Sequence, residues 1–222
     1  MTHTLHRQGS DDLARDYVVL VMGAKGFTRE GAAPALRRCL EVILRHHPVN
    51  WGDGRTGNTF SRSREEILAG IGDNSVIHGV FTDPDTVARV LADLKELDTG
   101  MSVVVSGLFD RVHPCVREAG LEPHTVEFSL GVHGRVERLP ADPLVVQIHT
   151  MCGHGMVSYG LISHLAGEVA AGRLSADRAA ATMAANCHCG VFNPRRAEAL
   201  ISALARRQAV QPSGSGRGTA AP

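Results

Sequence analysis

Two short runs of apolar, mostly β-branched residues constrain the fold more than any other feature of this 222-residue chain. Residues 17–22 read Tyr-Val-Val-Leu-Val-Met, and residues 101–106 read Met-Ser-Val-Val-Val-Ser. Such runs are typical of buried strands, which need helices to cover them. Because helix-like stretches at 31–46 and 85–97 alternate with these runs, the sequence predicts a layered α/β fold.

The C-terminal third of the chain is predicted to be helical. Three helices are expected there, at 156–171, 175–185 and 195–207. Asn193 and Pro194 are suitable for the cap and the first position of the last helix. Further upstream, the alternating residues 124–130 and the segment 135–139 predict a hairpin, and residues 144–148 predict a short strand. The hairpin makes the predicted sheet a mixed one, with helices flanking it.

Composition excludes several classes of protein. The 23 basic and 23 acidic side chains cancel, and 43% of residues are hydrophobic, which excludes wholesale disorder. A chain without a positive surplus is not a general nucleic-acid binder, and no apolar run approaches the ~18 residues of a membrane span. The length predicts a single α/β domain over 16–207, with a flexible arm at 1–15 and a disordered tail at 208–222.

Cysteine usage points to the chemistry. Five cysteines, an odd number, together with a polar N-terminus that does not resemble a signal peptide, predict a cytoplasmic protein with reduced thiols. Cys152 lies in His-Thr-Met-Cys-Gly-His-Gly, and Cys187 and Cys189 lie in Asn-Cys-His-Cys-Gly. Both glycine-flanked segments are expected to precede helices, where the helix dipole favours a thiolate.

These cysteines are candidate metal ligands. Cys152, Cys187 and Cys189 with His154 give the number and type of ligands that tetrahedral zinc takes. The three thiols without the histidine match an iron–sulfur cluster with one open iron position. His149 is the spare ligand in either scheme. Because Cys-x-His and Cys-x-Cys are less usual spacings than Cys-x-x-Cys, reactive thiols without a metal stay an open alternative.

Residues 151–155 (Met-Cys-Gly-His-Gly) resemble the pentapeptide around one catalytic cysteine of the proline racemases and hydroxyproline epimerases. The resemblance implies that Cys152 and a second thiol, Cys189, exchange the α-proton of a substrate without a metal. It covers about five residues of the 222, and the motif around the second thiol differs from that of the family.

Residues 145–153 resemble the strand and His-x-x-Cys-Gly turn of the β-class carbonic anhydrases, which implies that His149 and Cys152 bind zinc. That family has a further cysteine in a Cys-x-Asp-x-Arg turn, whereas residues 105–111 of this chain contain no cysteine. Neither resemblance extends beyond about nine residues, so we assign the chain to neither family.

Further candidate site residues come from other segments. The candidate acid–base groups are His78, His124, His149 and His154. The candidate groups for binding an anionic substrate are Lys25, Arg55, Asn58 and Arg111. A hydrogen-bonded core histidine is the simpler interpretation of His78, and a mobile surface loop is the alternative to a substrate-covering loop at the glycine-rich residues 50–63.

The sequence therefore predicts a metal-dependent enzyme, with zinc or an iron–sulfur cluster, that acts on a small polar or anionic substrate. An open coordination position predicts lyase or hydrolase chemistry. Two alternatives remain: a metal-free cysteine acid–base enzyme of the racemase or epimerase type, and a non-enzymatic protein with a structural zinc site. We expect a small-molecule substrate, no nucleic-acid or membrane partner, and leave a homo-oligomer open.

Overall fold

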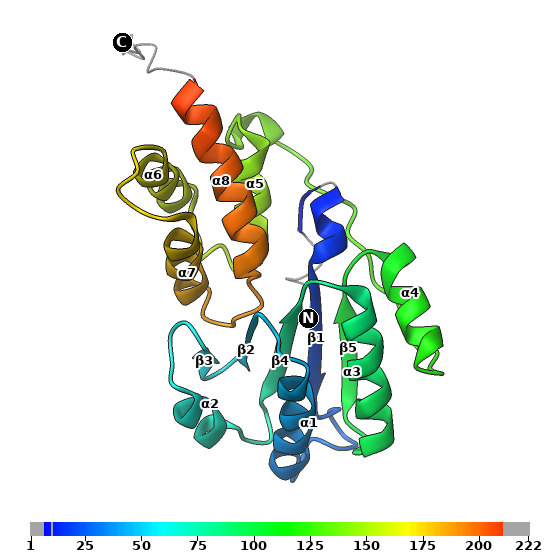
Figure 1. The fold of residues 1–222 in the computed structure, drawn as a ribbon. Helices are drawn as coiled ribbons and strands as arrows, with labels where there is room; N and C mark the ends of the chain where they lie inside the picture. Colours follow the sequence, from blue (N-terminus) through cyan, green and yellow to red (C-terminus); the bar gives the residue numbers. More distant parts are fainter. Residues whose placement is uncertain (1–6, 10, 211–222) are drawn as a thin grey trace.

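The computed structural model describes residues 7–9 and 11–210 (Figure 1). The strands are β1 (Tyr17–Met22), β2 (Asn50–Asp53), β3 (Gly57–Asn58), β4 (Val76–Phe81) and β5 (Ser102–Ser106). The helices are α1 (Ala33–Arg45), α2 (Arg64–Gly70), α3 (Pro84–Leu97), α4 (Phe109–Glu118), α5 (Pro143–Thr150), α6 (Tyr159–Ala170), α7 (Ala176–Asn186) and α8 (Pro194–Val210). The predicted α/β class with flanking helices and a helical C-terminal third is confirmed.

The strands form one sheet in the order β3-β2-β4-β1-β5, and the pairings described are antiparallel. Leu20 of β1 lies opposite His78 of β4. Successive side chains of a strand point to opposite faces. In β1, therefore, Val18 and Leu20 contact one apolar cluster, and Val19 contacts another.

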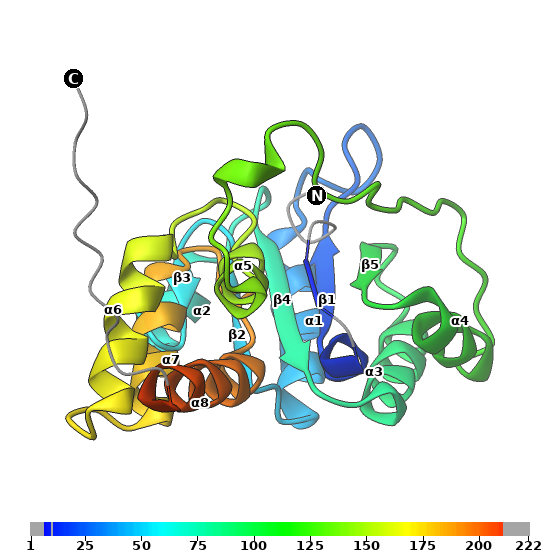
Figure 2. The same ribbon diagram turned by 90° about the horizontal axis from the view of Figure 1, so that it is seen from above.

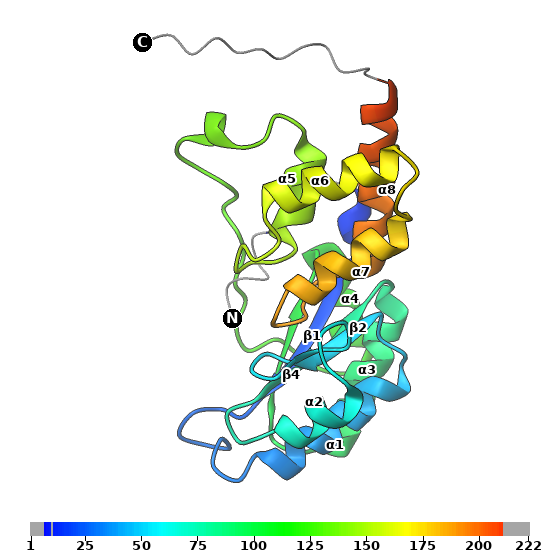
Figure 3. The ribbon, with the colours of Figure 1, turned by 90° about the vertical axis from the view of Figure 1, so that its left-hand side faces the viewer.

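Helices cover both faces of the sheet. The cluster containing Val19 includes buried side chains of α1 and α3, whereas the cluster containing Val18 and Leu20 includes buried side chains of α5, α6, α7 and α8. Figures 2 and 3 show α1 and α3 on one side and α5–α8 grouped on the other. His78 is buried on the face that the C-terminal helices cover, since it alternates in β4 with Ile77 of the opposite cluster.

The helices begin where short-range signals place them. Asp83 caps α3 by accepting a hydrogen bond from the Thr86 amide at 2.8 Å, and Pro84 occupies the first turn. Asn193 accepts from the Arg196 amide at 3.1 Å, so the predicted start of α8 is confirmed. None of the helices in 7–9 and 11–210 has the length and apolar character needed to cross a membrane.

Two secondary-structure predictions were wrong. Residues 124–135 have no regular structure, and 136–138 form one 3-10 turn, so the hairpin is absent from the described chain. The alternating pattern there leaves Phe128 and Leu130 exposed because no neighbouring strand pairs with them. Residues 144–148 belong to α5, which Asp142 caps with Pro143 in its first turn. These helix-start signals decide the structure of residues 144–148, although their apolar run by itself predicts a strand.

Three further expectations also changed. The glycine-rich residues 50–63 form β2, a turn and β3. In the arm expected at 1–15, residues 11–15 form a 3-10 helix, and Arg196 of α8 binds both Asp12 and the carbonyl of Gln8. The tail expected from 208 begins within α8, which reaches Val210; residues 211–222 and 1–6 lie outside the described residues.

Candidate functional site: three converging thiols

Three of the five cysteines meet between the C-terminal helices and the sheet. Cys152 lies in the turn between α5 and α6, and Cys187 and Cys189 lie between α7 and α8. The Sγ atoms of Cys187 and Cys189 are 3.7 Å apart, and Cys152 belongs to the same cluster of buried residues. All three thiols are reduced and buried, with exposed fractions of 1%, 0% and 5% in chain order. The three cysteines therefore lie in one buried cluster, and their role as metal ligands stays a prediction.

Cys152 lies where its thiolate is strongly stabilised. The hydrogen bond from Cys187 lowers its pKa most, and the backbone N–H groups of Val157, Met156 and His154 lower it further. Burial acts in the opposite direction, and the pKa falls from 9.0 to about 6. Cys152 is therefore mostly a thiolate at neutral pH.

The source of this stabilisation differs from the expected one. Cys152 follows the C-terminal end of α5, with Met151 as the C-cap, and α6 begins only at Tyr159. The C-terminal end of a helix disfavours a negative charge. The stabilising dipoles are instead the amides of the 153–157 turn, which fold around the sulfur. Gly155, at a φ of 71°, gives this turn a conformation that other residues rarely adopt.

Cys187 complements Cys152 as the proton donor. Its hydrogen bonds to Cys152 and Cys189, together with burial, raise its pKa far above that of an ordinary thiol. The cluster thus contains one group that favours the thiolate form and a neighbour that keeps its proton.

Two asparagines from the sheet hold the loop that carries Cys187 and Cys189. Asn58 of β3 donates to the Cys187 carbonyl at 2.8 Å and to the Ala184 carbonyl at 3.3 Å. Asn50 of β2 donates to the carbonyls of Gly190 and Phe192 at 2.9 and 3.1 Å. Both asparagines are fully buried. Asn58 was predicted to bind substrate, and the structure shows it positioning the thiol loop instead.

Gly190 allows this loop to approach β4 closely. It has a φ of 74°, and a Cβ atom built there would lie 2.7 Å from His78 Nε2 and closer still to Asn58 Cβ. His78 Nε2 is buried and makes no hydrogen bond with any described residue. Burial lowers the pKa of His78, and Cys189 is the strongest influence in the opposite direction. His78 is therefore a neutral imidazole directed at the thiol loop.

Replacing Gly190 with alanine is expected to lower the free energy of unfolding by about 2–5 kcal/mol. The positive φ costs about 1–2 kcal/mol for a residue with a Cβ atom, and the overlap with Asn58 and His78 adds about 1–3 kcal/mol. Gly172→Ala is the matched control, because Gly172 has a φ of 69° and open space at its Cβ position. Denaturant unfolding of both variants measures the difference, and equal losses would refute the close approach.

The N-terminal segment also binds the thiol loop. Arg7 donates to the carbonyl of Val191 and pairs with the buried Asp16. Asn193 donates to the Arg15 carbonyl at 3.0 Å and to Asp16 Oδ1 at 3.1 Å. The loop is thus fixed from β2, β3 and the segment that precedes β1.

His149 supports the other side of the cluster. Its Nδ1 atom lies 2.8 Å from the Val157 carbonyl, and its ring packs against Tyr159 at 4.2 Å between centroids. The Val157 amide is one of the donors to Cys152. His149 therefore positions a turn that stabilises the thiolate, and the structure gives its ring no direct contact with the sulfurs.

The remaining predicted site residues fall into two groups. His154 is exposed and adjoins the cluster through its backbone amide. The Arg55 carbonyl lies 3.1 Å from Nε2 of His188, so Arg55 adjoins the thiol loop through its backbone. Both side chains reach solvent at the surface above the cluster.

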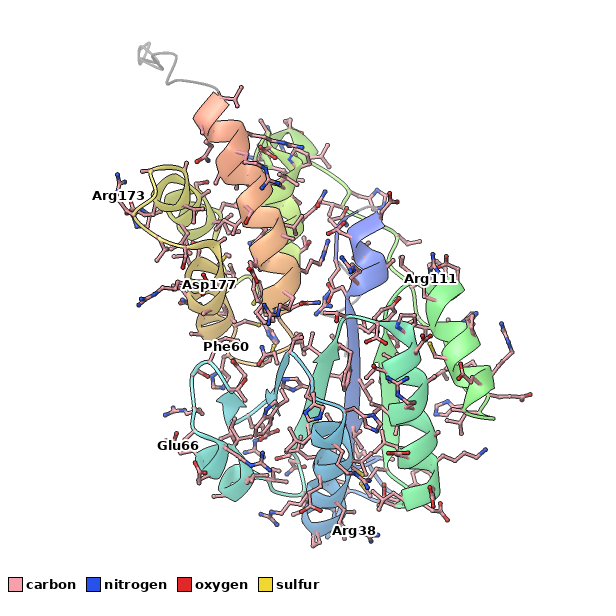
Figure 4. All side chains as sticks on the ribbon, in the orientation of Figure 1. Arg38, Phe60, Glu66, Arg111, Arg173 and Asp177 are labelled. Carbon is pink, nitrogen blue, oxygen red and sulfur yellow. The ribbon has the colours of Figure 1, made fainter. Side chains whose placement is uncertain are left out.

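The other group lies elsewhere. Lys25 is exposed in the loop between β1 and α1. Arg111 belongs to α4, on the opposite side of the molecule from Asp177 of α7 (Figure 4). His124 lines a cavity of about 520 Å³ beside β5, at the sheet edge opposite β3. The structure therefore does not bring these three residues to the thiols.

Sequence reasoning missed the residues that position the thiols. Asn50, Arg7, Gly190 and Asn193 contribute through long-range contacts, and only Asn193 had a local signal, as a helix cap. A buried asparagine next to a strand turn has no pattern that distinguishes it from a surface turn residue.

The metal centre that the sequence predicts is a separate question. No group of three or more His, Cys, Asp or Glu side chains within the described ranges is arranged to hold a metal ion.

Searches against protein-family models, curated proteins and solved structures find no match to this chain.

Proposed function

We propose that the protein carries out thiol exchange with sulfur electrophiles, such as disulfides, with Cys152 as the attacking thiolate and Cys187 as the resolving thiol. The observation that carries the proposal is the grouping of Cys152, Cys187 and Cys189 in one buried cluster, in which the Sγ atoms of Cys187 and Cys189 are 3.7 Å apart. Cys187 also lowers the pKa of Cys152. The thiolate is the nucleophile in such exchange, and a pKa near ambient pH is the optimum for an attacking thiol.

The proposed reaction is a two-electron exchange. The Cys152 thiolate attacks a disulfide R–S–S–R′, forms a mixed disulfide with R–S and releases R′–S⁻. Cys187 then attacks Cys152 Sγ, forms the Cys152–Cys187 disulfide and releases R–S with the proton that Cys187 held. The substrate disulfide is reduced and the protein is oxidised. Cys187, which has the largest influence on the pKa of Cys152, is the proposed thiol for the second step.

The geometry supports this chemistry better than a two-base racemase. A racemase needs room for a substrate carbon between its two thiols, whereas Cys152 and Cys189 lie in one buried cluster with Cys187, whose sulfur is 3.7 Å from that of Cys189. A reducing cytoplasm, which the sequence predicts, would regenerate the dithiol. The loop fixed by Asn50 and Asn58 keeps the reacting sulfurs in place.

The test uses a background in which only the three clustered thiols remain. Cys39 and Cys115 are buried, burial raises the pKa of each, and both are replaced with alanine. This protein is mixed with an aromatic disulfide that releases a coloured thiolate. We expect two coloured thiolates per chain, reflecting mixed-disulfide formation and then resolution.

Adding single changes to this background separates the two steps. Cys152→Ser is expected to reduce the rate at pH 7 at least about tenfold, because the low-pKa nucleophile is lost. Cys187→Ser is expected to leave a mixed disulfide on Cys152, detected by mass spectrometry. A Cys152→Ser variant that reacts as fast as the three-thiol parent would contradict the proposal.

The zinc or iron–sulfur centre with lyase or hydrolase activity stays a prediction, and one observation favours it. Two sulfurs bound to one tetrahedral zinc lie about 3.8 Å apart, close to the 3.7 Å between Cys187 and Cys189. Metal analysis of protein purified without oxygen decides between a metal centre and thiol exchange. A stoichiometric metal that blocks the coloured reaction until a chelator removes it would replace thiol exchange as the function.

A further inference from the structure

We propose that Cys189 is the exit thiol of a three-cysteine relay, in which the disulfide formed between Cys152 and Cys187 passes to Cys187 and Cys189. This inference rests on the proposed thiol exchange and assigns the role of its third thiol. The chemical class of partner that follows is a dithiol reductant, which opens the Cys187–Cys189 disulfide and returns the protein to its reduced form.

The order of the three sulfurs supports the relay. Cys187 is the thiol common to both pairs, because its sulfur is 3.7 Å from that of Cys189 and it has the largest influence on the pKa of Cys152. A thiol that attacks the Cys152–Cys187 disulfide from the Cys189 side therefore meets Cys187 first. The loop between Cys187 and Cys189 is held at both ends by Asn58 and Asn50.

The chemistry of the leaving group sets the direction of the transfer. When Cys189 attacks the Cys187 sulfur, the sulfur of Cys152 leaves. A thiol with a lower pKa leaves faster, and the amides of the 153–157 turn stabilise the departing thiolate. The step forms one S–S bond, breaks one, and transfers no net electrons.

His78 supplies the proton acceptor that this step needs. The Cys189 thiol must lose its proton to attack, and the surrounding sulfurs are buried from water. His78 is 1% exposed, its Nε2 atom faces Gly190, the residue after Cys189, and this nitrogen has no hydrogen-bond partner in the described part of the chain. The proton therefore passes from Cys189 to His78, and Cys152 is released as a thiolate.

Exposure places the exit at Cys189. Its exposed fraction of 5% is the largest of the three, compared with 1% for Cys152 and 0% for Cys187. After the transfer, Cys152 is again a thiolate held by its amide donors.

The experiment follows which thiol is free as the disulfide ages. The three-thiol background, with Cys39 and Cys115 replaced by alanine, receives one equivalent of the aromatic disulfide and is quenched with an alkylating agent at increasing times. We expect Cys152 to be protected from alkylation first and to become free again, while Cys187 and Cys189 become protected together. A Cys152 thiol that stays protected to the end of the reaction overturns the relay.

Two variants sharpen the result. Cys189→Ser is expected to stop at the Cys152–Cys187 disulfide, with two coloured thiolates still released. His78→Gln is expected to slow the transfer about 100-fold relative to the first phase, the lower end of a general-base contribution, and to remove the pH dependence of the transfer. If Cys152 becomes free at the parental rate in Cys189→Ser, the role of Cys189 is refuted. Transfer at the parental rate in His78→Gln refutes the role of His78.

Failure of the relay is distinguishable from failure of the proposed function. If thiol exchange is correct and the relay is not, the parent releases both coloured thiolates and ends with Cys152 blocked. If thiol exchange itself is wrong, the parent releases no more coloured thiolate than the Cys152→Ser variant, and the relay is overturned with it.

Discussion

Replacing Arg196 with methionine is expected to lower the free energy of unfolding by about 3–5 kcal/mol, the usual cost of removing one partner of a buried ion pair. The guanidinium of Arg196 binds Asp16 at 3.0 Å, Asp12, and the Gln8 carbonyl at 2.6 Å. The side chains of Arg196 and Asp16 are 2% and 0% exposed. Without the arginine, Asp16 loses a buried counter-charge and the N-terminal segment loses its contact with α8.

Arg195 is the matched control for this variant. It lies next to Arg196 in α8, but its side chain is 69% exposed and its partner Glu198 is 37% exposed. Arg195→Met is therefore expected to change stability by less than about 0.5 kcal/mol. Equal unfolding midpoints for the two arginine variants would show that the buried pair is unimportant.

The alkylation rate of Cys152 is expected to rise with pH through a midpoint near 6, about three units below that of an ordinary thiol. Only the thiolate reacts, so a lowered pKa moves the rise to lower pH and leaves a plateau at neutral pH. The hydrogen bonds from Cys187 and the 153–157 amides are the cause of the shift. Mass spectrometry of the peptide that contains Cys152, after timed exposure to iodoacetamide, gives the profile.

Changing the main hydrogen-bond donor tests the cause of this profile. Cys187→Ala removes the largest stabilising influence on the Cys152 thiolate and should move the midpoint to higher pH. Cys39→Ala is the control, since Cys39 is hydrogen bonded to Thr99 in another part of the core. A midpoint near 9 in the unchanged protein would contradict the stabilised thiolate.

The elements that were predicted correctly are those whose signals are local. β1 and β5 are compact apolar runs, and α3 has a cap, a proline and an apolar stripe in one segment. Residues 144–148 show the limit of this reasoning. A run of five apolar or amphipathic residues fits a strand and a buried helix equally well, and here Asp142 and Pro143 start a helix.

The candidate site was likewise predicted only in part, and the correct part again came from local signals. The grouping of Cys152 with Cys187 and Cys189 followed from their glycine-flanked segments, because such segments permit close backbone approach. The ionisation of each thiol depends on which neighbour donates to it, and that is fixed by the turn at 153–157 and by the packing of α7 against α8. Periodicity carries no information on either contact.

The two asparagine clamps have a consequence for how the protein matures. Asn50 and Asn58 are separated by 140 and 129 residues from the carbonyls of Gly190 and Cys187 that they bind. Contacts of such high sequence separation close long loops, and the entropy cost of closing a loop precedes the gain from the contact. A nascent chain thus has its cysteines in an ordinary, weakly reactive state until α7 and α8 dock on β2 and β3. Reactivity of Cys152 at pH 6 to 7 would therefore report that synthesis and docking are complete.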